Sequence, residues 1–475
     1  MTQTLPGREE FELQMSDPVH VKKMRLRANL GALVGTGIEW YEYFVYGSMA
    51  ALVFPKLFFP SDSALVSTLE SFASFALAFL VRPIGGAIFG HLGDRIGRRR
   101  TLIITLLVTG IATTCVGLLP AAVAVEGSSY PVAGGLATFM LLTLRMVQGI
   151  GVGGEWGGSV SMALEWGEGK KKGLAGAWPQ MGSPIGLIAA NGAMFLVTRF
   201  FTQSELLAYA WRYPFLFSGV LMLIGLWVRL RMAETPVFIR SAETRRISHT
   251  PVKTVFTKYP KQLGLAAVLR MSEQAPFFVF TVYVLSYLTS DVYTGAFAED
   301  STMAKASVTG AIVIAAASDL ILVPVFGALA DRVGRRVMYY AGCVALIVVA
   351  LPYFWILNSG NHLAIFLAIS CSLLPHSLQY GSQSSLIAEQ FPDEVRATGS
   401  SVGYQLSSII AGGPAPLIAA AIVGETPGEI GRAYGIAAYL VGCGILSALA
   451  LKVMPRRGFL GGSPESVRQT SSASV

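Results

Sequence analysis

The chain has 475 residues, of which 53% are hydrophobic and 13% are charged, and its mean hydropathy is +0.56. Soluble domains carry about a quarter charged residues, so this composition excludes a soluble enzyme and indicates a membrane protein. The formal net charge is +8, but the basic residues stand in short clusters at the ends of apolar runs. Such clusters set membrane topology, and we therefore expect no nucleic-acid partner.

Apolar runs long enough to cross a bilayer predict twelve transmembrane helices. The runs lie near residues 29–54, 65–91, 101–123, 134–163, 173–199, 211–231, 263–289, 306–330, 337–357, 362–387, 398–423 and 431–454. The predicted fold is therefore an all-α membrane protein with two pseudo-symmetric bundles of six helices.

The polar and basic connection after the sixth run divides the chain into two halves. We expect an N-terminal bundle over 29–231, a cytoplasmic central loop over 232–262 and a C-terminal bundle over 263–454. Residues 1–28 are polar and lack the apolar stretch of a signal peptide, so they are predicted to stay in the cytoplasm. The Ser-rich residues 455–475 are predicted to form a disordered cytoplasmic tail.

The distribution of positive charge sets the expected orientation. With a cytoplasmic N-terminus, most of the 36 Lys and Arg residues fall on cytoplasmic connections. The basic residues expected on the outer side are Lys56, Arg199, Arg212, Lys305 and Arg432. We expect a multi-pass protein of the inner or plasma membrane with both termini in the cytoplasm, surrounded by lipid.

The four cysteines give no sign of a metal site or a disulfide. They lie inside apolar runs without close spacing, which is typical of small buried residues, and they are Cys115, Cys343, Cys371 and Cys443. The chain also lacks a Gly-x-x-x-x-Gly-Lys phosphate loop and the motifs of hydrolases. We therefore expect no cofactor, no metal and no enzymatic activity, and an ion gradient as the energy source.

A ten-residue motif occurs twice. Gly90–Arg99 reads GHLGDRIGRR and Gly327–Arg336 reads GALADRVGRR, each between two apolar runs, so the chain is predicted to be a duplication. An Asp at a helix end beside a Gly turn can accept hydrogen bonds from the opposite half and hold the cytoplasmic side shut. The alternative, that the arginines only set orientation, explains their charge but not the repeated Asp and Gly. The predicted gating residues are Asp94, Arg95, Arg98, Asp331, Arg332 and Arg335.

The first apolar run contains two carboxylates, Glu39 and Glu42, whose spacing of three places them on one helical face. Charged groups at bilayer depth cost free energy and usually serve a pathway. Two crowded carboxyls resist double ionisation, so at least one is expected to hold a proton that it can load and release. The alternative is that one of them pairs permanently with an arginine and only supports the structure.

The fourth run contains Arg145, and Glu155 follows ten residues later. At the helical rise these two residues are about 15 Å apart, too far to pair. We therefore expect Arg145 to pair with Glu39 or Glu42 of the neighbouring helix. The glycines of Gly149–Gly154 resemble a dinucleotide loop only superficially, because no strand precedes them, and they predict close helix packing.

In the second half, Arg270 and Glu273 can pair across one helical turn. Two interpretations stay open: a substrate carboxylate competes with Glu273 for Arg270, or the two side chains only neutralise each other. Asp319 and His376 are lone ionisable groups among apolar neighbours, and a packing role and a transport role both stay open for them.

The duplicated Gly-x-x-x-Asp-Arg-x-Gly-Arg-Arg resembles the loop signature of the major facilitator superfamily, and Arg145-x-x-Gln148-Gly149 resembles its fourth-helix motif. More narrowly, three segments are similar to the metabolite:proton symporter family: Ile38–Gly47, Arg82–Gly86 and Gln148–Gly158. The resemblance covers residues from about 25 to 455, although that family usually has Asp at the position of Glu42. Arg270-x-x-Glu273 and Val402–Gln405 are most similar to its shikimate-type branch.

The resemblance implies a transporter that works by alternating access, as proton-coupled uptake of a small organic acid such as a shikimate-like carboxylate. It implies that Glu39, Glu42 and Arg145 serve proton coupling. The candidates for substrate contact are Arg270, Glu273, Tyr43 and Gln148. Arg82 matches a hallmark of the family whose role, structural or electrostatic, stays open.

Two other functions remain as alternatives. Proton-coupled uptake of proline or betaine is disfavoured because the chain lacks the coiled-coil tail of that branch. A membrane sensor would need a folded signalling domain, which neither residues 1–28 nor the tail supplies. The expected partners are the small-molecule substrate, protons and the lipid bilayer, and the chain is expected to act as a monomer.

Overall fold

The computed structural model describes residues 17–124, 127–129, 131–166, 172–235, 238–239, 251–289, 301–424 and 430–455. Regular structure in these ranges is helical, apart from one isolated bridge between Ala121 and Val132. The parts that fall outside the described residues are 1–16 of the predicted N-terminal segment, 236–237 and 240–250 of the predicted central loop, and 456–475 of the predicted tail.

The first half runs from α2 to α10. Its elements are α2 (Pro18–Leu52), α3 (Phe54–Leu57), α4 (Ala64–Ile96), α5 (Arg98–Val116), α6 (Gly135–Glu165), α7 (Lys172–Gln180), α8 (Gly182–Phe200), α9 (Gln203–Glu205), a π-helical turn (Leu206–Ala210) and α10 (Arg212–Leu230).

The second half runs from α12 to α22. Its elements are α12 (Pro251–Lys258), α13 (Pro260–Leu269), α14 (Met271–Phe278), a π-helical turn (Val279–Tyr283), α15 (Val284–Thr289), α16 (Ser301–Val333), α17 (Arg335–Leu357), α18 (His362–Ser370), α19 (Leu374–Ala388), a 3-10 turn (Asp393–Val395), α20 (Arg396–Ser407), a second π-helical turn (Ser408–Gly412), α21 (Pro414–Val423) and α22 (Ile430–Val453).

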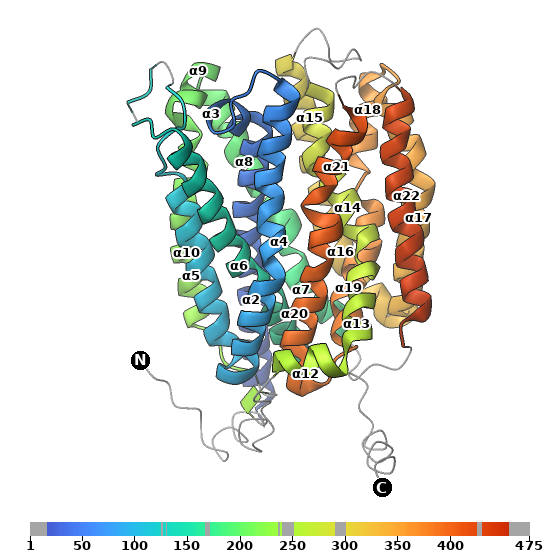
Figure 1. Cartoon of the computed structure of the whole chain (residues 1–475). Coiled ribbons are helices and arrows are strands. Elements are labelled where there is room, and N and C mark those ends of the chain that lie inside the picture. Colours follow the sequence, from blue (N-terminus) through green and yellow to red (C-terminus); the bar gives the residue numbers. More distant parts are fainter. Residues whose placement is uncertain are drawn as a thin grey trace.

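The long helices lie roughly parallel, with the first half on one side of the molecule and the second half on the other (Figure 1). In the described ranges, ten helices are long and apolar enough to cross a membrane. The other two predicted spans coincide with α2, whose carboxylates and tyrosines lower its hydropathy, and with the divided segment α13–α15. The predicted all-helical membrane fold with two six-helix bundles is confirmed.

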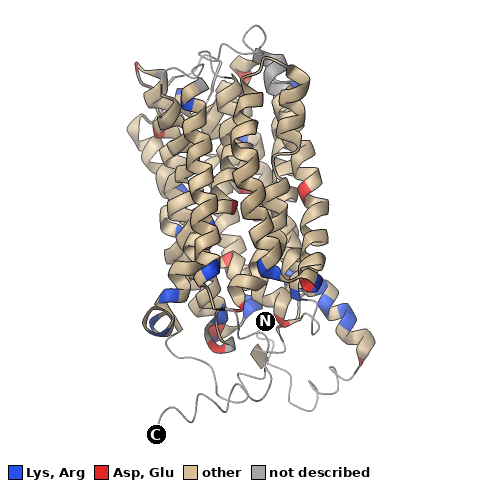
Figure 2. Cartoon of the chain, turned by 90° about the vertical axis from the view of Figure 1, so that its right-hand side faces the viewer, with Lys and Arg blue, Asp and Glu red and all other residues tan. Residues whose placement is uncertain are grey.

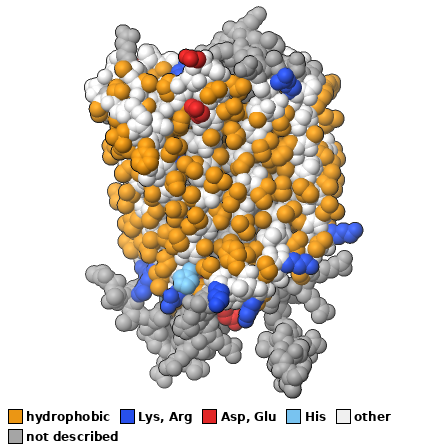
Figure 3. Space-filling view, viewed as in Figure 1, with side chains coloured by type: hydrophobic (Ala, Val, Ile, Leu, Met, Phe, Trp, Pro, Cys, Tyr) orange, Lys and Arg blue, Asp and Glu red, His pale blue; other side chains and the backbone are white. Residues whose placement is uncertain are grey.

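Apolar side chains cover the lateral surface of the bundle (Figure 3). Lys and Arg residues gather at one end of the bundle (Figure 2). We call this end the basic end; its basic residues include Arg95, Arg98, Arg99, Lys258, Arg335 and Arg336. A broad apolar belt bounded by charge is what a bilayer requires, so the chain is a multi-pass membrane protein.

The glycines of α6 let this helix lie directly against α4, as predicted. A Cβ atom at Gly149 would overlap the carbonyl of Ala78, and one at Gly153 would overlap the carbonyl of Arg82. Small residues at such a contact let two backbones approach closely, which strengthens packing inside a membrane.

Three predicted features differ from the structure. Helices α2, α4 and α16 extend beyond the apolar runs, because polar residues at the membrane boundary continue the helix. The spans expected at 173–199, 263–289, 362–387 and 398–423 are each divided. The breaks lie at Met181, at Arg270, near Ser372 and at a π-helical turn, respectively. Cys371 is exposed, whereas Cys343 and Cys443 are buried as expected.

Candidate functional site

The first copy of the repeated motif joins the two halves at the basic end. α4 ends at Gly97, whose φ of +102° is accessible to glycine but strained for other residues. Just before this turn, Asp94 Oδ2 accepts hydrogen bonds from the backbone N–H of Thr398 at 3.0 Å and from its hydroxyl at 2.7 Å. Arg98 pairs with Asp94 at 2.9 Å and with Glu165 at 3.2 Å.

The second copy makes the equivalent contact in the reverse direction. Gly334 has a φ of +107°, and Asp331 accepts hydrogen bonds from the backbone N–H groups of Gly173 at 2.8 Å and Leu174 at 3.1 Å. These two donors lie in the first turn of α7, where N–H groups lack helical partners. Arg335 pairs with Asp331 at 3.5 Å and also with Glu389.

Two predicted gating residues lie away from these contacts. Arg95 and Arg332 directly follow the two aspartates, and this step of one residue turns both side chains outward, where they are exposed. Arg95 contacts only His91 among the described contacts, at 3.4 Å. A gating role for Arg95 and Arg332 therefore stays a prediction, while Asp94 and Asp331 do reach the opposite half.

Arg145 does not pair with Glu39 or Glu42, and that prediction is wrong. Its guanidinium lies 3.9 Å from the centre of the Tyr46 ring and 4.9 Å from that of Tyr43. It also donates to Gln148 Oε1. Aromatic faces attract a guanidinium and can take the place of a carboxylate partner. The presence of two carboxylates on α2 therefore did not decide which groups contact Arg145.

A chain of side chains nevertheless connects Glu42 with Arg145. The Thr113 hydroxyl donates to Glu42 Oε2 at 3.0 Å, Gln148 Nε2 donates to that hydroxyl at 2.9 Å, and Gln148 Oε1 accepts from Arg145. Glu39 is buried, and its Oε2 atom has no hydrogen-bond partner in the described part of the chain. Of the predicted coupling residues, Glu42 and Arg145 are thus connected by hydrogen bonds without forming an ion pair.

Arg82, whose role the sequence left open, is buried against two aromatic rings. Its guanidinium carbon is 4.7 Å from the centre of the Tyr43 ring and 4.3 Å from that of Phe79. Its charge interacts electrostatically with Glu39, Arg145 and Arg270. No ion pair with Arg82 is found within the described ranges, so this buried cation lies on ring faces between the two halves.

Sequence reasoning missed the buried ion pair between Arg229 and Glu155. Arg229 of α10 pairs with Glu155 of α6, which also accepts a hydrogen bond from the Thr105 hydroxyl at 2.8 Å. Arg229 stands beside Arg231 at a helix end and therefore resembled a topology signal. The buried Glu155, a carboxylate at bilayer depth, was the feature that called for such a partner.

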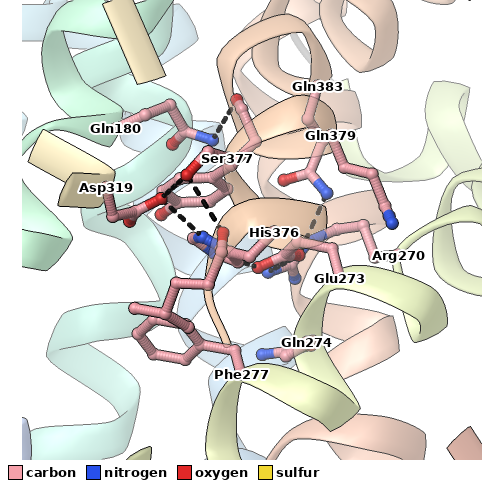
Figure 4. Close-up of polar contacts among 12 residues, drawn as sticks. Gln180, Arg270, Glu273, Gln274, Phe277, Asp319, His376, Ser377, Gln379 and Gln383 are labelled. Atoms are coloured by element: carbon pink, nitrogen blue, oxygen red, sulfur yellow. Dashed lines mark hydrogen bonds and ion pairs between the residues drawn. The ribbon is translucent and has the colours of Figure 1, made fainter. Parts of the chain in front are cut away.

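In the second half, Asp319 and His376 are not lone groups (Figure 4). His376 Nδ1 lies 3.1 Å from Asp319 Oδ1, and His376 Nε2 lies 3.4 Å from Glu273 Oε1. Glu273 pairs with Arg270 at 3.2 Å, as its spacing predicted. Four ionisable side chains from three parts of the second half thus form one continuous chain.

Arg270 ends this chain at the boundary between the halves. Its guanidinium carbon lies 3.2 Å from the centre of the Tyr404 ring, and it donates to the Tyr404 carbonyl at 2.5 Å. The opposite face of Tyr404 stacks on Trp156 of the first half, with ring centres 3.6 Å apart. The Tyr404 ring therefore lies between Arg270 and Trp156 of α6.

The helix breaks of the second half lie close to these residues. Arg270 separates α13 from α14, and the turn at Cys371–Leu373 precedes His376 by a few residues. Broken helices expose backbone groups and reorient side chains, and in transporters they occur near the sites where solutes bind.

Comparison with known proteins places the chain in a family. The family model of the Major Facilitator Superfamily matches residues 33–416. The inner membrane metabolite transport protein YhjE of Escherichia coli (strain K12) is 37% identical over 397 residues, which cover 83% of this chain and 87% of that protein. The shikimate transporter of the same strain is 34% identical over 434 residues, covering 90% and 94%.

A more distant relative and a solved structure agree with this family. The proline/betaine transporter of Escherichia coli (strain K12) is 30% identical over 448 residues, covering 92% of this chain and 85% of that protein. The structure of the proton:xylose symporter XylE superposes with a TM-score of 0.68 at 18% identity, covering 95% and 98%. That likeness shows the fold. The chain belongs to the major facilitator superfamily and is a membrane transporter.

Proposed function

We propose that the chain takes up a small organic acid together with protons, by alternating access of a central site to the two faces of the membrane. The observation that carries this proposal is the group of three buried guanidinium side chains at the centre, Arg82, Arg145 and Arg270. Only Arg270 has a carboxylate partner in the described part of the chain.

A buried cation is costly unless an anion or a hydrogen-bond network compensates it. The rings of Tyr43, Tyr46 and Tyr404 compensate these guanidinium groups in part. A substrate carboxylate would supply the missing negative charge, and a guanidinium offers it two parallel N–H donors. The Tyr43 ring contacts both Arg82 and Arg145, so Tyr43 remains a candidate for substrate contact, as does Gln148.

The basic end is proposed to face the cytoplasm, because cytoplasmic loops of membrane proteins carry an excess of Lys and Arg. Both termini then lie in the cytoplasm, and the location is the cell's inner or plasma membrane. We further propose that residues 29–231 and 263–454 move as the two rocking units of a monomer. In this arrangement Asp94 and Asp331 hold the cytoplasmic face shut.

Glu39 and Glu42 are first-half candidates for the coupling proton. Glu39 interacts electrostatically with Arg82, and Glu42 connects with Arg145 through Thr113 and Gln148. Replacing either carboxyl by Gln mimics the permanently protonated form. A coupling role predicts that Glu39→Gln or Glu42→Gln abolishes gradient-driven accumulation while substrate exchange persists. Accumulation at the parental level in both variants would remove them from the coupling path.

A specific observation supports a second candidate function, the uptake of proline or betaine. Trp40 stacks on Phe44 with ring centres 5.4 Å apart, and both contact Phe277 of the second half at 5.8 Å. Aromatic groups of this kind can bind a quaternary ammonium by cation–π interaction. These rings pack against one another, which leaves the carboxylate proposal as the better supported one.

A competition screen in energised proteoliposomes tests the proposal. Shikimate and other organic acids, proline and glycine betaine would compete for uptake under an inward proton gradient. The carboxylate proposal predicts inhibition by an organic acid and collapse of uptake when a protonophore is added. Inhibition by betaine and proline alone would favour the second candidate, and uptake insensitive to the protonophore would reject proton coupling.

A further inference from the structure

The chain of ionisable residues in the second half alternates in sign. From α16 to the break before α14, the order is Asp319, His376, Glu273 and Arg270, linked at 3.1, 3.4 and 3.2 Å (Figure 4). All four residues are at most 3% exposed. With His376 protonated, two negative and two positive charges sum to zero, which is the arrangement that a low-dielectric interior tolerates best.

Neighbouring side chains hold the members of this chain in place. The imidazole of His376 lies between the rings of Phe277 and Tyr380, with ring centres 4.6 and 4.5 Å away. The Ser377 hydroxyl donates to Asp319 Oδ1 at 2.5 Å. Each imidazole nitrogen therefore faces one carboxylate, and a proton can be exchanged along the chain without large side-chain movements.

Glu273 also has an environment suited to both of its protonation states. Gln383 Nε2 donates to Glu273 Oε2 at 3.0 Å, while Gln383 Oε1 has no partner in the described part of the chain. In the observed arrangement, the amide N–H group of Gln383 donates to the ionised carboxylate of Glu273. Rotation of the same amide would present Oε1 as the acceptor for a protonated Glu273.

Other titratable or charged groups also face this chain. They are Tyr339 and Cys343 of α17, Tyr380 of α19, Tyr404 of α20 and Arg82 of α4. α22 contributes the Ser447 hydroxyl, which accepts from the backbone N–H of Ser272. The phenols and the thiol are neutral at neutral pH, so the carboxylates, the imidazole and the guanidinium groups are the members of this set that can carry charge.

We propose that Glu273 takes up one proton for each substrate carboxylate that binds to Arg270, and that His376 and Asp319 position and balance this exchange. This inference rests on the proposed function and places the coupling step in the second half. The substrate carboxylate takes over the guanidinium of Arg270. Glu273, displaced from its cation, binds a proton delivered from water through the open face, and the neutral sum of charges is restored.

Charge balance explains why one proton binds for each substrate carboxylate. A substrate carboxylate alone would add one unit of negative charge to a buried and balanced set, which is costly at low dielectric. One proton on Glu273 cancels this charge. Release of the proton toward the cytoplasm returns Glu273 to Arg270, and the restored ion pair displaces the substrate, so each event drives the other.

The test measures proton uptake on binding with purified full-length protein in a weakly buffered solution. Shikimate is the first probe, followed by the organic acid that competes best in the uptake screen. The parent should take up about one proton per ligand, and its affinity should fall about tenfold for each unit rise of pH above the point where Glu273 ionises. Glu273→Gln should retain binding, take up almost no proton and lose this pH dependence.

Two comparison variants separate a coupling role from a structural one. Glu70→Gln removes an exposed carboxyl outside this chain of residues and should leave the proton uptake on binding intact. If Glu273→Gln does not fold, Glu273→Asp keeps a titratable group and should move the pH midpoint of binding. The inference would be overturned if Glu273→Gln still took up about one proton per ligand. It would also be overturned if the pH midpoint of binding did not move in Glu273→Asp. Either of these two results would leave proton-coupled uptake as the proposed function, because the parent would still bind protons with the substrate. Ligand binding by the parent without any proton uptake would overturn the proposed function as well.

Discussion

Asp94 and Thr398 are 304 positions apart in the chain, yet the carboxylate of Asp94 accepts two hydrogen bonds from Thr398. The donors are the backbone N–H and the hydroxyl at the start of α20, so one side chain of the first half caps a helix of the second half. This contact and the equivalent one of Asp331 with α7 join the halves at the basic end.

We predict that Asp94→Asn shifts the population toward opening at the basic end. The variant loses the ion pair with Arg98 and the charge that strengthens both hydrogen bonds. Hydrogen bonds to a charged group contribute about 1.5–3 kcal/mol, which corresponds to a shift of about tenfold or more. Labelling of single cysteines placed at the basic end measures the shift. Thr398→Val keeps the backbone donor and should give a smaller change; unchanged labelling in Asp94→Asn would reject the latch.

Gly157 marks a second contact between the halves. A Cβ atom there would overlap the Ser401 hydroxyl and lie 2.9 Å from the carbonyl oxygen of Ala397. We therefore expect Gly157→Ala to prevent close approach of α6 and α20, and so to favour opening at the basic end and slow transport. The matched control is Gly192→Ala, because nothing lies within 4 Å of a Cβ atom there. Cysteine labelling at the basic end measures this opening as well. Equal labelling of Gly157→Ala and Gly192→Ala would contradict the close contact.

The buried pair of Arg229 and Glu155 is predicted to support the fold and not the transport step. Removing one partner leaves a buried charge uncompensated, at a cost of about 3–5 kcal/mol. Arg229→Gln and Glu155→Gln should each lower the melting temperature in detergent. The double variant should recover most of the loss, because no charge remains unpaired. A double variant that is less stable than both single variants would show that the pair does more than neutralise itself.

Glu234 should give the first half a pH-dependent component of stability. Its carboxylate accepts from the backbone N–H groups of Arg98 at 3.1 Å and Arg99 at 3.2 Å, while burial raises its pKa above the ordinary value of 4.5. A raised pKa in the folded state means that stability from this group is fully present below the ordinary pKa. It is lost as the pH rises through the folded value.

Melting temperatures of the parent and of Glu234→Gln between about pH 5 and about pH 8 check this sign. The parent should lose more stability than the variant as the pH rises, because Gln does not ionise. A larger loss in Glu234→Gln would contradict the assigned direction.

Local features of the chain were predictable from the sequence. Apolar runs gave the transmembrane helices, because span length is set by the bilayer. The repeated glycines at 97 and 334 have positive φ angles, which explains why both copies need glycine. The pairing of Arg270 with Glu273 followed from their spacing on one helix.

Contacts between distant helices were not predictable in the same way. His376 and Asp319 are 57 positions apart, and neither residue type nor spacing indicates that helix packing joins them. Arg145 had two carboxylates on a neighbouring helix but lies on tyrosine rings, because packing brings those rings closer. The limits of the two halves and the roles assigned to the central charges stay predictions.

The most direct test of proton-coupled uptake is proton movement caused by a substrate gradient alone. Proteoliposomes without any initial pH difference would contain a pH-sensitive dye, and an inward gradient of the competing organic acid would be applied. We predict that the lumen acidifies in the parent and that this acidification is lost in Glu273→Gln, although substrate still equilibrates. Substrate influx into the parent with no change of lumenal pH would contradict the account.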